Sequence, residues 1–241
     1  MNLNHDISTQ IVKAIQSALN AKQALLHEPV FKGKEKEYLI ECVNSTFVAS
    51  VGKFINLFEQ ELCDFTGAKH AIATVNGTSA LQVALRIAGV ERGQEVLIPA
   101  LTFIATANAV SYCNADPHFI DSETSSLGID VPKLRDYLSI ISEKKGTDLI
   151  NKKTGKIIKA LVPMHTFGHP CNLDEILALA HDFNIPIIED AAESLGSFYN
   201  NKHTGTFGLC GTLSFNGNKT VTTGGGGAIL TNDEKFSKYA R

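Results

Sequence analysis

Apolar and polar residues follow two alternating patterns along the middle of the chain. The short apolar runs cover residues 70–75, 95–100, 118–121, 157–166 and 185–191, and stretches with helical periodicity at 76–89, 102–113, 130–142 and 172–183 separate them. Strands that alternate with helices in this way build βαβ units around a buried, mostly parallel sheet. We therefore expect an α/β fold, a three-layer α/β/α sandwich with a mostly parallel mixed sheet.

The region before this alternation is helical in pattern. Residues 6–26 place Ile7, Ile11 and Ile15 on one side and predict an amphipathic helix. A second helical stretch follows Gly33, and a third covers residues 50–67, where a terminal glycine is typical of a helix end. We expect residues 1–69 to form a helical segment that packs on a large domain made of residues 70–241.

The last part of the chain changes pattern again. After residue 192 short strand-like runs are separated by glycine-rich turns. Residues 233–241 read as the first turns of a helix, with no glycine or closing turn after them. We therefore expect the chain to be truncated before a small C-terminal domain.

A polar, lysine-rich segment over residues 143–156 interrupts the domain, and it predicts an exposed hairpin or loop. Its lysines are suited to contact a phosphate, but such runs more commonly form a solvated face, which we favour.

Composition narrows the class of protein. Of the 241 residues, 44% are hydrophobic and 20% are charged, as in globular proteins, and the formal net charge of -3 gives no basic face for nucleic acid or for a membrane surface. The five cysteines are odd in number and form no C-x-x-C pair, which favours reduced thiols in a cytoplasmic protein. The first ten residues are polar and no run of eighteen apolar residues occurs, so we expect neither a secretory signal nor a membrane span.

Two segments that follow predicted strands carry candidate binding groups. Thr78 and Ser79 lie where a strand meets a helix, and hydroxyls and free N–H groups at a helix start bind phosphate. Taken alone, this motif is better explained as a simple helix N-cap. Phe103 follows the next strand, where an aromatic side chain can stack on a flat ring or belong to the core.

Two later segments carry charged candidates. Asp190 closes an apolar strand, and a buried carboxylate there is costly without a positive partner such as a protonated pyridine nitrogen. A capping role at a helix start is the alternative. Lys219 lies among small residues and glycines, so it is either a held amine nucleophile or a surface lysine in a flexible loop.

Other motifs are incomplete. The chain has no G-x-x-x-x-G-K-[ST] sequence, and the glycines at 224–227 precede a strand rather than a helix, unlike a dinucleotide-binding loop. His165 and His169 have the spacing of a helical zinc pair, but Gly168 and Pro170 exclude a helix there and no third ligand is evident, so we expect no metal.

Taken in order, the four segments supply the contacts that a flat, phosphorylated, aldehyde-bearing cofactor needs. The chain resembles the DegT/DnrJ/EryC1/StrS family of sugar aminotransferases, which use pyridoxal 5'-phosphate and have the type I (aspartate aminotransferase) fold. The resemblance is carried by TVNGTSAL (74–81), PALTFIATANAVSYC (99–113), VPMHTFGHP (162–170), EDAAESLGS (189–197) and SFNGNKTVTTGGGGAILTND (214–233).

The resemblance implies a role for each candidate residue. Thr78, Ser79 and Ser214 would bind the cofactor phosphate, and Phe103 would stack on the pyridine ring. Asp190 would pair with the ring nitrogen, Glu193 would lie near the ring hydroxyl, and Lys219 would be the Schiff-base lysine and the catalytic acid and base. Related enzymes that remove a sugar hydroxyl have histidine at that position, so Lys219 favours transamination.

The same resemblance suggests substrates and partners. Segments 26–33, 45–54, 164–170 and 214–219 are most similar to enzymes that aminate C4 of UDP-4-keto-6-deoxy-N-acetylglucosamine in bacillosamine and legionaminic-acid synthesis, with glutamate as the expected donor. Residues 217–224 also resemble perosamine synthase, which acts on a GDP-linked sugar. The family implies a homodimer and a role in surface polysaccharide or lipopolysaccharide biosynthesis. A fragment that binds the cofactor without turnover is the further alternative.

Overall fold

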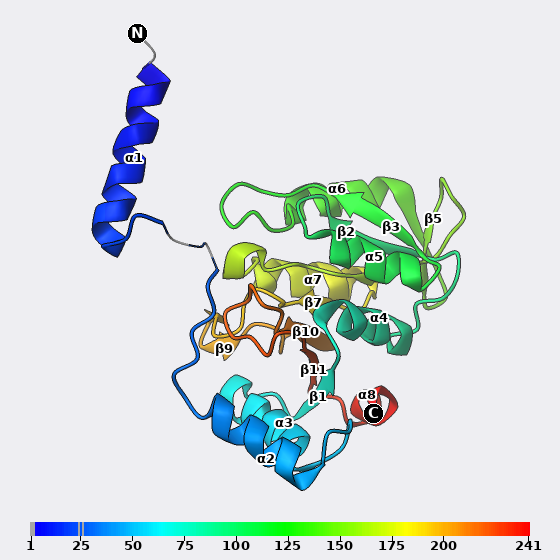
Figure 1. Cartoon of the computed structure of the whole chain (residues 1–241). Coiled ribbons are helices and arrows are strands. Elements are labelled where there is room, and N and C mark those ends of the chain that lie inside the picture. Colours follow the sequence, from blue (N-terminus) through cyan, green and yellow to red (C-terminus); the bar gives the residue numbers. More distant parts are fainter. Residues whose placement is uncertain (1–2, 24, 26) are drawn as a thin grey trace.

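The structure is a computed structural model that describes residues 3–23, 25 and 27–241 (Figure 1). Its helices are α1 (Leu3–Leu19), α2 (Glu35–Ser45), α3 (Lys53–Thr66), α4 (Gly77–Ile87), α5 (Ile104–Tyr112), α6 (Val131–Ile141), α7 (Leu173–Phe183) and α8 (Glu234–Ala240), with a short 3-10 turn at Thr166–Gly168. Its strands are β1 (His70–Thr74), β2 (Glu95–Pro99), β3 (Asp116–Ile120), β4 (Ser142–Lys145), β5 (Asp148–Asn151), β6 (Ile158–Leu161), β7 (Ile188–Asp190), β8 (Phe198–Tyr199), β9 (Lys202–His203), β10 (Cys210–Ser214) and β11 (Gly227–Thr231).

The central sheet runs in the order β1-β11-β10-β7, and single bridges from Leu161 to Ile187 and from Met164 to Asp190 continue it into β6-β2-β3. Strand β11 is antiparallel to β1 and β10, while the pairs β10–β7, β2–β6 and β2–β3 are parallel. The predicted mostly parallel mixed sheet is therefore confirmed.

Helices cover both faces of this sheet. On one face α4 and α5 pack on alternate strand residues such as Val96 and Ile98, and Phe236 of α8 joins the same cluster. On the other face Leu97 and Leu161 pack against α6 and α7. Because neighbouring residues of a strand point to opposite faces, strands with apolar residues on both faces supply both clusters. The three-layer α/β/α sandwich is confirmed.

Local capping explains where the helices begin and end. The side chain of Asn76 accepts a hydrogen bond from the Ser79 N–H at 2.7 Å at the start of α4, and Asp130 accepts one from Lys133 at the start of α6. Gly67 ends α3 in the left-handed conformation, with φ of 74°, as its position in the sequence predicts.

The first helix differs from its prediction. It ends at Leu19 rather than at residue 26, because Asn20 takes a left-handed φ of 49°; positions 24 and 26 of the predicted helix lie outside the described residues. In Figure 1 α1 stands apart from the sheet, and Ile7, Ile11 and Ile15 are about half exposed. Among the described residues no helix is long and apolar enough to cross a membrane.

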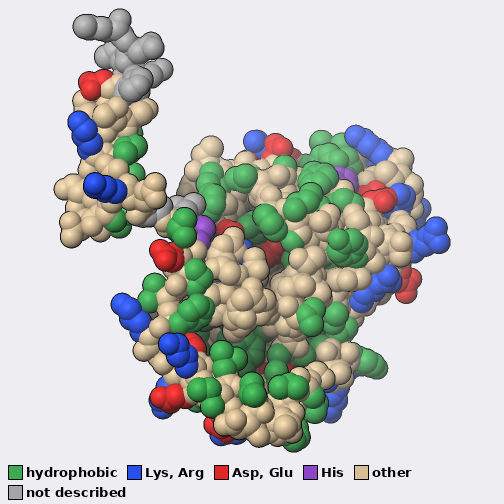
Figure 2. Space-filling model, viewed as in Figure 1, with side chains coloured by type: hydrophobic (Ala, Val, Ile, Leu, Met, Phe, Trp, Pro, Cys, Tyr) green, Lys and Arg blue, Asp and Glu red, His purple; other side chains and the backbone are tan. Residues whose placement is uncertain are grey.

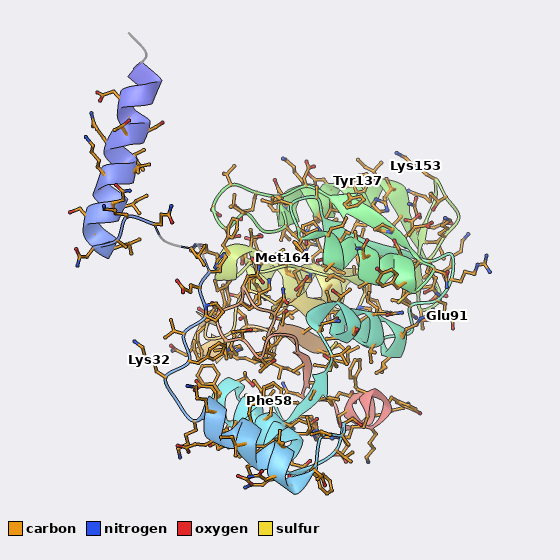
Figure 3. The ribbon with its side chains drawn as sticks, in the orientation of Figure 1. Lys32, Phe58, Glu91, Tyr137, Lys153 and Met164 are labelled. Carbon is orange, nitrogen blue, oxygen red and sulfur yellow. The ribbon has the colours of Figure 1, made fainter. Side chains whose placement is uncertain are left out.

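Helix α3, in contrast, packs on the sheet. Its Leu62 belongs to a cluster with Ala71 of β1 and Leu213 of β10. The Phe58 ring meets the buried Phe215 ring edge-on at 5.1 Å between centroids, and Figure 3 shows it between α3 and the sheet. This contact packs α3 against Phe215, at the start of the segment that carries Lys219.

The lysine-rich segment forms a hairpin of β4 and β5, as expected. Lys144 donates to the main-chain oxygen of Asp182, Lys145 pairs with Glu143, and Lys156 pairs with Asp116. These lysines thus have protein partners on a solvated edge, where Figure 3 labels Lys153.

A buried carboxylate fastens this edge to the sheet. Glu95 at the start of β2 is 4% exposed and accepts hydrogen bonds from Asn151 Nδ2 at 2.8 Å and from Thr154 Oγ1 at 2.6 Å. His118 Nδ1 lies 2.8 Å from the same carboxylate, and its Nε2 lies 3.1 Å from the Tyr137 hydroxyl. Burial opposes ionisation of Glu95, but these hydrogen bonds outweigh it and hold the pKa of the carboxyl below its ordinary value.

Glu95→Gln should lower the free energy of unfolding at neutral pH by about 1–3 kcal/mol, because it weakens a hydrogen-bonded buried charge. The folded-state pKa of Glu95 is depressed, so its stabilisation is complete above about pH 4.5 and is lost as the pH falls through the folded-state value. Urea unfolding between pH 3 and pH 7 should therefore show a flatter acid limb for the variant. Glu91→Gln, at an exposed glutamate nearby (Figure 3), is the control and should change stability by less than about 0.5 kcal/mol; equal effects would contradict the prediction.

Candidate functional site

The predicted site residues lie at one edge of the sheet. Asp190 and Ser214 are the last residues of β7 and β10, Phe103 directly precedes α5 after β2, and Thr78 and Ser79 lie in the first turn of α4 after β1. Strands β1, β2, β7 and β10 point the same way, so their carboxyl ends meet at one edge. Ligands of open α/β sheets bind at this edge.

Lys219 is held within this group by a short turn. Its N–H donates to the Asn216 oxygen at 3.0 Å, and the loop closes where Thr223 N–H donates to the Phe215 oxygen at 3.0 Å. The Lys219 Nζ lies 3.3 Å from Glu193 Oε1 and 5.9 Å from the centre of the Phe103 ring. The structure thus brings Lys219, Glu193 and Phe103 together, with the lysine side chain 14% exposed.

Asp190 is the buried acid of the site. Its residue is 3% exposed, its Oδ2 accepts a hydrogen bond from Thr106 Oγ1 at 2.7 Å, and its Oδ1 accepts one from the Ala192 N–H at 3.2 Å. Burial raises the pKa of this carboxyl, and the two hydrogen bonds and the charge of Lys219 only partly offset that effect. A cation placed beside Asp190 would therefore be strongly favoured.

The start of α4 lies against the end of β10. A Cβ added to Gly77 would come within 2.9 Å of the Ser214 Cβ, and one added to Gly227 would come within 2.4 Å of the Asn76 carbonyl carbon. Glycine at both positions permits this close approach. Thr78, Ser79 and Ser214 are half-buried here, so their hydroxyls adjoin a helix N-terminus, which favours an anion.

The acid next to Asp190 has a structural role. Glu189 is fully buried and accepts hydrogen bonds from the N–H groups of Gly205, Phe207 and Gly208 at 2.6–2.8 Å. Its Oε2 also lies 3.1 Å from His165 Nε2, while His165 Nδ1 accepts from the Cys171 N–H at 3.2 Å. His165 therefore anchors the strand end, and in the described part of the chain no group of three or more His, Cys, Asp or Glu residues could hold a metal ion.

Two residues of the site were not among those predicted. Thr106 lies one helical turn after Phe103, and that spacing is the only sequence signal for its bond to Asp190. The Phe167 N–H donates to Glu193 Oε2 at 2.9 Å, and no sequence pattern indicates this contact.

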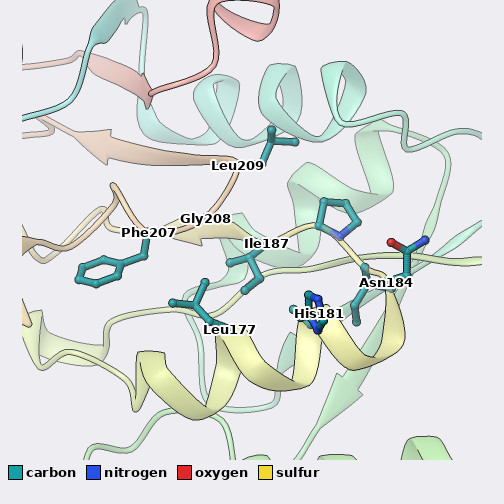
Figure 4. A pocket seen from close by; sticks show the side chains of 10 residues that line it. Leu177, His181, Asn184, Ile187, Phe207, Gly208 and Leu209 are labelled. Carbon is teal, nitrogen blue, oxygen red and sulfur yellow. The ribbon is translucent and has the colours of Figure 1, made fainter.

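A separate hollow lies at the opposite edge of the sheet, between the end of α7 and the start of β10 (Figure 4). It measures about 400 Å³, and Leu177, Ile187 and Leu209 are among its lining residues. None of the predicted site residues lines it, so the candidate site rests on the convergent polar groups at the carboxyl edge.

The fold places the chain among aminotransferases. It superposes on the aminotransferase from Psychrobacter cryohalolentis with a TM-score of 0.77 at 31% sequence identity, over 88% of this chain and 50% of that one. A DegT DnrJ EryC1 StrS aminotransferase from Brucella abortus gives a TM-score of 0.76 at 33% identity, over 85% and 53% of the two chains. The domain thus has the type I fold of pyridoxal-phosphate-dependent transferases.

Residues 29–241 match the DegT/DnrJ/EryC1/StrS aminotransferase family, and the chain belongs to this family. It is 42% identical over 213 residues to the GDP-perosamine synthase of Caulobacter vibrioides, covering 88% of this chain and 53% of that protein. It is 39% identical over 220 residues to the putative pyridoxal phosphate-dependent aminotransferase EpsN of Bacillus subtilis, covering 91% and 54%. The chain spans about half the length of the curated relatives it matches.

Thr106→Val should destabilise the protein by about 1.5–3 kcal/mol, because it removes the donor to Oδ2 of the buried Asp190 carboxyl and leaves only the Ala192 N–H on Oδ1. Thr212→Val is the matched control, since Thr212 is equally buried but its hydroxyl makes only a 3.4 Å contact with a main-chain oxygen, that of Glu189. Its cost should stay below about 1 kcal/mol. Denaturant unfolding measures the loss of stability in both variants. Equal losses would show that the Thr106–Asp190 hydrogen bond stabilises the fold no more than the long Thr212 contact does.

Proposed function

We propose that this chain is the cofactor-binding part of a pyridoxal-phosphate-dependent aminotransferase that transfers an amino group to a nucleotide-linked keto-sugar. The observation that supports this most directly is the convergence of Lys219, Glu193 and Phe103 beside the buried Asp190. Family membership supports the same class of reaction.

The residues of the site fit the cofactor. The anion-favouring start of α4 with Thr78, Ser79 and Ser214 suits its phosphate, and the buried Asp190 suits its protonated ring nitrogen. Phe103 is 62% exposed, so its ring is available to a flat partner. Glu193 would lie near the ring hydroxyl, and the Lys219 amine would bind the cofactor covalently.

The bound cofactor would supply an electron sink, and the chain's own groups would control protons. Lys219 Nζ, once free of the cofactor, would take and return the proton of the reacting carbon as general base and acid. Asp190 would keep the ring nitrogen charged, and its bond from Thr106 keeps the carboxyl in place.

The comparisons change the preferred sugar substrate. The sequence segments favour a UDP-linked 4-keto-6-deoxy-N-acetylglucosamine, yet the GDP-perosamine synthases of Caulobacter vibrioides and Escherichia coli O157:H7 match at 42% and 41% identity. We therefore propose a GDP-linked 4-keto-6-deoxy sugar as the acceptor, with glutamate as the donor. The product would serve polysaccharide biosynthesis, as in the Bacillus subtilis relative named for spore coat polysaccharide.

A second copy of the chain is the proposed partner. Figure 2 shows apolar side chains over α2 and the turn that follows it, where Leu39, Val43, Phe47 and Val48 are 62–79% exposed. Apolar exposure on this scale is typical of an interface. Sedimentation of the protein would reveal a monomer if the proposal is wrong.

Reconstitution with pyridoxal phosphate followed by borohydride reduction should leave the cofactor on Lys219, as peptide mass spectrometry can establish. Lys219→Ala should abolish the adduct, because it removes the amine that lies beside Glu193 and Phe103 at the carboxyl edge. Lys238→Ala, at an exposed lysine of α8, is the control and should retain it. An adduct on a different lysine would overturn the assignment of the site.

The nucleotide preference can be tested on the cofactor-loaded protein by titration calorimetry with GDP and with UDP. We expect GDP to bind at least about tenfold more tightly, a difference of about 1.4 kcal/mol. Tighter binding of UDP would contradict this proposal and favour a UDP-linked 4-keto sugar as the acceptor.

A further inference from the structure

The turn at Thr166–Gly168 has an unusual backbone beside the lysine. Phe167 takes φ of 52° and ψ of 26°, and Gly168 follows with φ of 83°. Glycine accepts this left-handed conformation freely, but for a bulky residue it costs about 1–2 kcal/mol. The Phe167 side chain is 78% exposed, so burial of its ring does not offset that cost.

The conformation has a specific result at the site. It directs the Phe167 N–H to Glu193 Oε2 at 2.9 Å, while Oε1 of the same carboxylate lies 3.3 Å from Lys219 Nζ. Each oxygen of Glu193 therefore has its own partner, one from the main chain of the turn and one from the lysine. Strain that persists beside a reactive group commonly serves the geometry of that group.

The surrounding structure holds the turn in place. Gly168 N–H donates to the His165 oxygen at 3.1 Å, and His165 N–H donates to the Asp190 oxygen at 3.1 Å. A Cβ at Gly168 would come within 3.0 Å of the Glu193 oxygen, so the turn lies directly against the Glu193 main chain. The turn is thus fixed to the strand end that carries Asp190.

We propose that Phe167 is a positioning residue: its left-handed backbone presents an N–H that holds the Glu193 carboxylate against Lys219. The inference rests on the proposed role of Lys219 as the reactive amine of the site. Phe167 acts through its main chain, so the effect of a substitution depends on the backbone preference of the new residue and not on loss of the ring.

The matched variants are Phe167→Gly and Phe167→Val. Both remove the ring, but glycine accepts the left-handed backbone and β-branched valine resists it. The readout is the rate at which the Lys219 amine displaces sulfite from trinitrobenzenesulfonate, followed by mass spectrometry of its peptide. A Lys219 side chain that is released from Glu193 reacts faster, because its Nζ is no longer held 3.3 Å from the carboxylate and is more accessible to the reagent.

Glu193→Gln should raise this rate about fivefold, the scale of a partly exposed ion pair. Phe167→Val should raise the reaction rate of Lys219 to nearly the same value. The double variant with Glu193→Gln should react no faster than Glu193→Gln alone. Phe167→Gly should stay within about twofold of the rate of the unsubstituted chain. Lys238, paired with Glu234 at 3.0 Å on α8, is the internal reference. Asn184→Val puts the same strain at a distant left-handed residue, with φ of 56°, and should leave the rate at Lys219 unchanged.

Equal acceleration in the glycine and valine variants would assign the effect to the ring, and no acceleration in either would remove Phe167 from the site; both results overturn the proposal. If the valine variant does not fold, amide exchange of Phe167 decides the matter. Glu193→Ala should then speed exchange of this N–H about tenfold, because its acceptor is gone, and unchanged exchange refutes the contact. Neither measurement uses the cofactor, so failure here is distinguishable from failure of the Lys219 adduct.

Discussion

The site depends on the cost of burying the Asp190 carboxylate at the end of β7. The residue is 3% exposed, and burial raises the pKa of its carboxyl in spite of bonds from Thr106 and Ala192. A buried carboxyl of this kind favours a cation beside it. The lysine, the aromatic ring and the helix start are arranged around that requirement.

Glu189, the acid adjacent to Asp190, has a structural role. Glu189 and Asp190 are consecutive, and alternation along a strand sends their side chains to opposite faces. Glu189 is satisfied by three main-chain N–H groups and fixes the segment 205–208 to the sheet. Glycine is required there, since a Cβ at Gly208 would lie 2.5 Å from the Ile187 oxygen. Glu189 thus stabilises the fold, whereas Asp190 is the residue that we propose for the cofactor.

Local signals in the sequence predicted most of the fold. The alternating strands and helices and the Gly67 stop were sufficient because burial and capping act over a few residues. The end of α1 was missed, since nothing in its periodicity marks the left-handed Asn20. The contacts of Thr106 and Phe167 were missed because they join residues 84 and 26 positions apart, and only the folded chain brings these together.

Asp190 and Lys219 lie in two different kinds of element, a packed strand and a glycine-containing loop. Asp190 and Thr106 lie on a strand and a helix whose core faces are closely packed, so the charge they present has a fixed position. Lys219 lies in a loop where Gly217 has no neighbour within 4 Å of an added Cβ and Gly224 has φ of 82°. In the proposed function Lys219 would both bind the cofactor and release it, and a loop permits that change more readily than a strand does. Glu193 links these two parts, since its carboxylate contacts Lys219 through one oxygen and a turn anchored on β7 through the other. In the role that we propose for Phe167, the geometry of that turn governs how the lysine lies relative to Asp190.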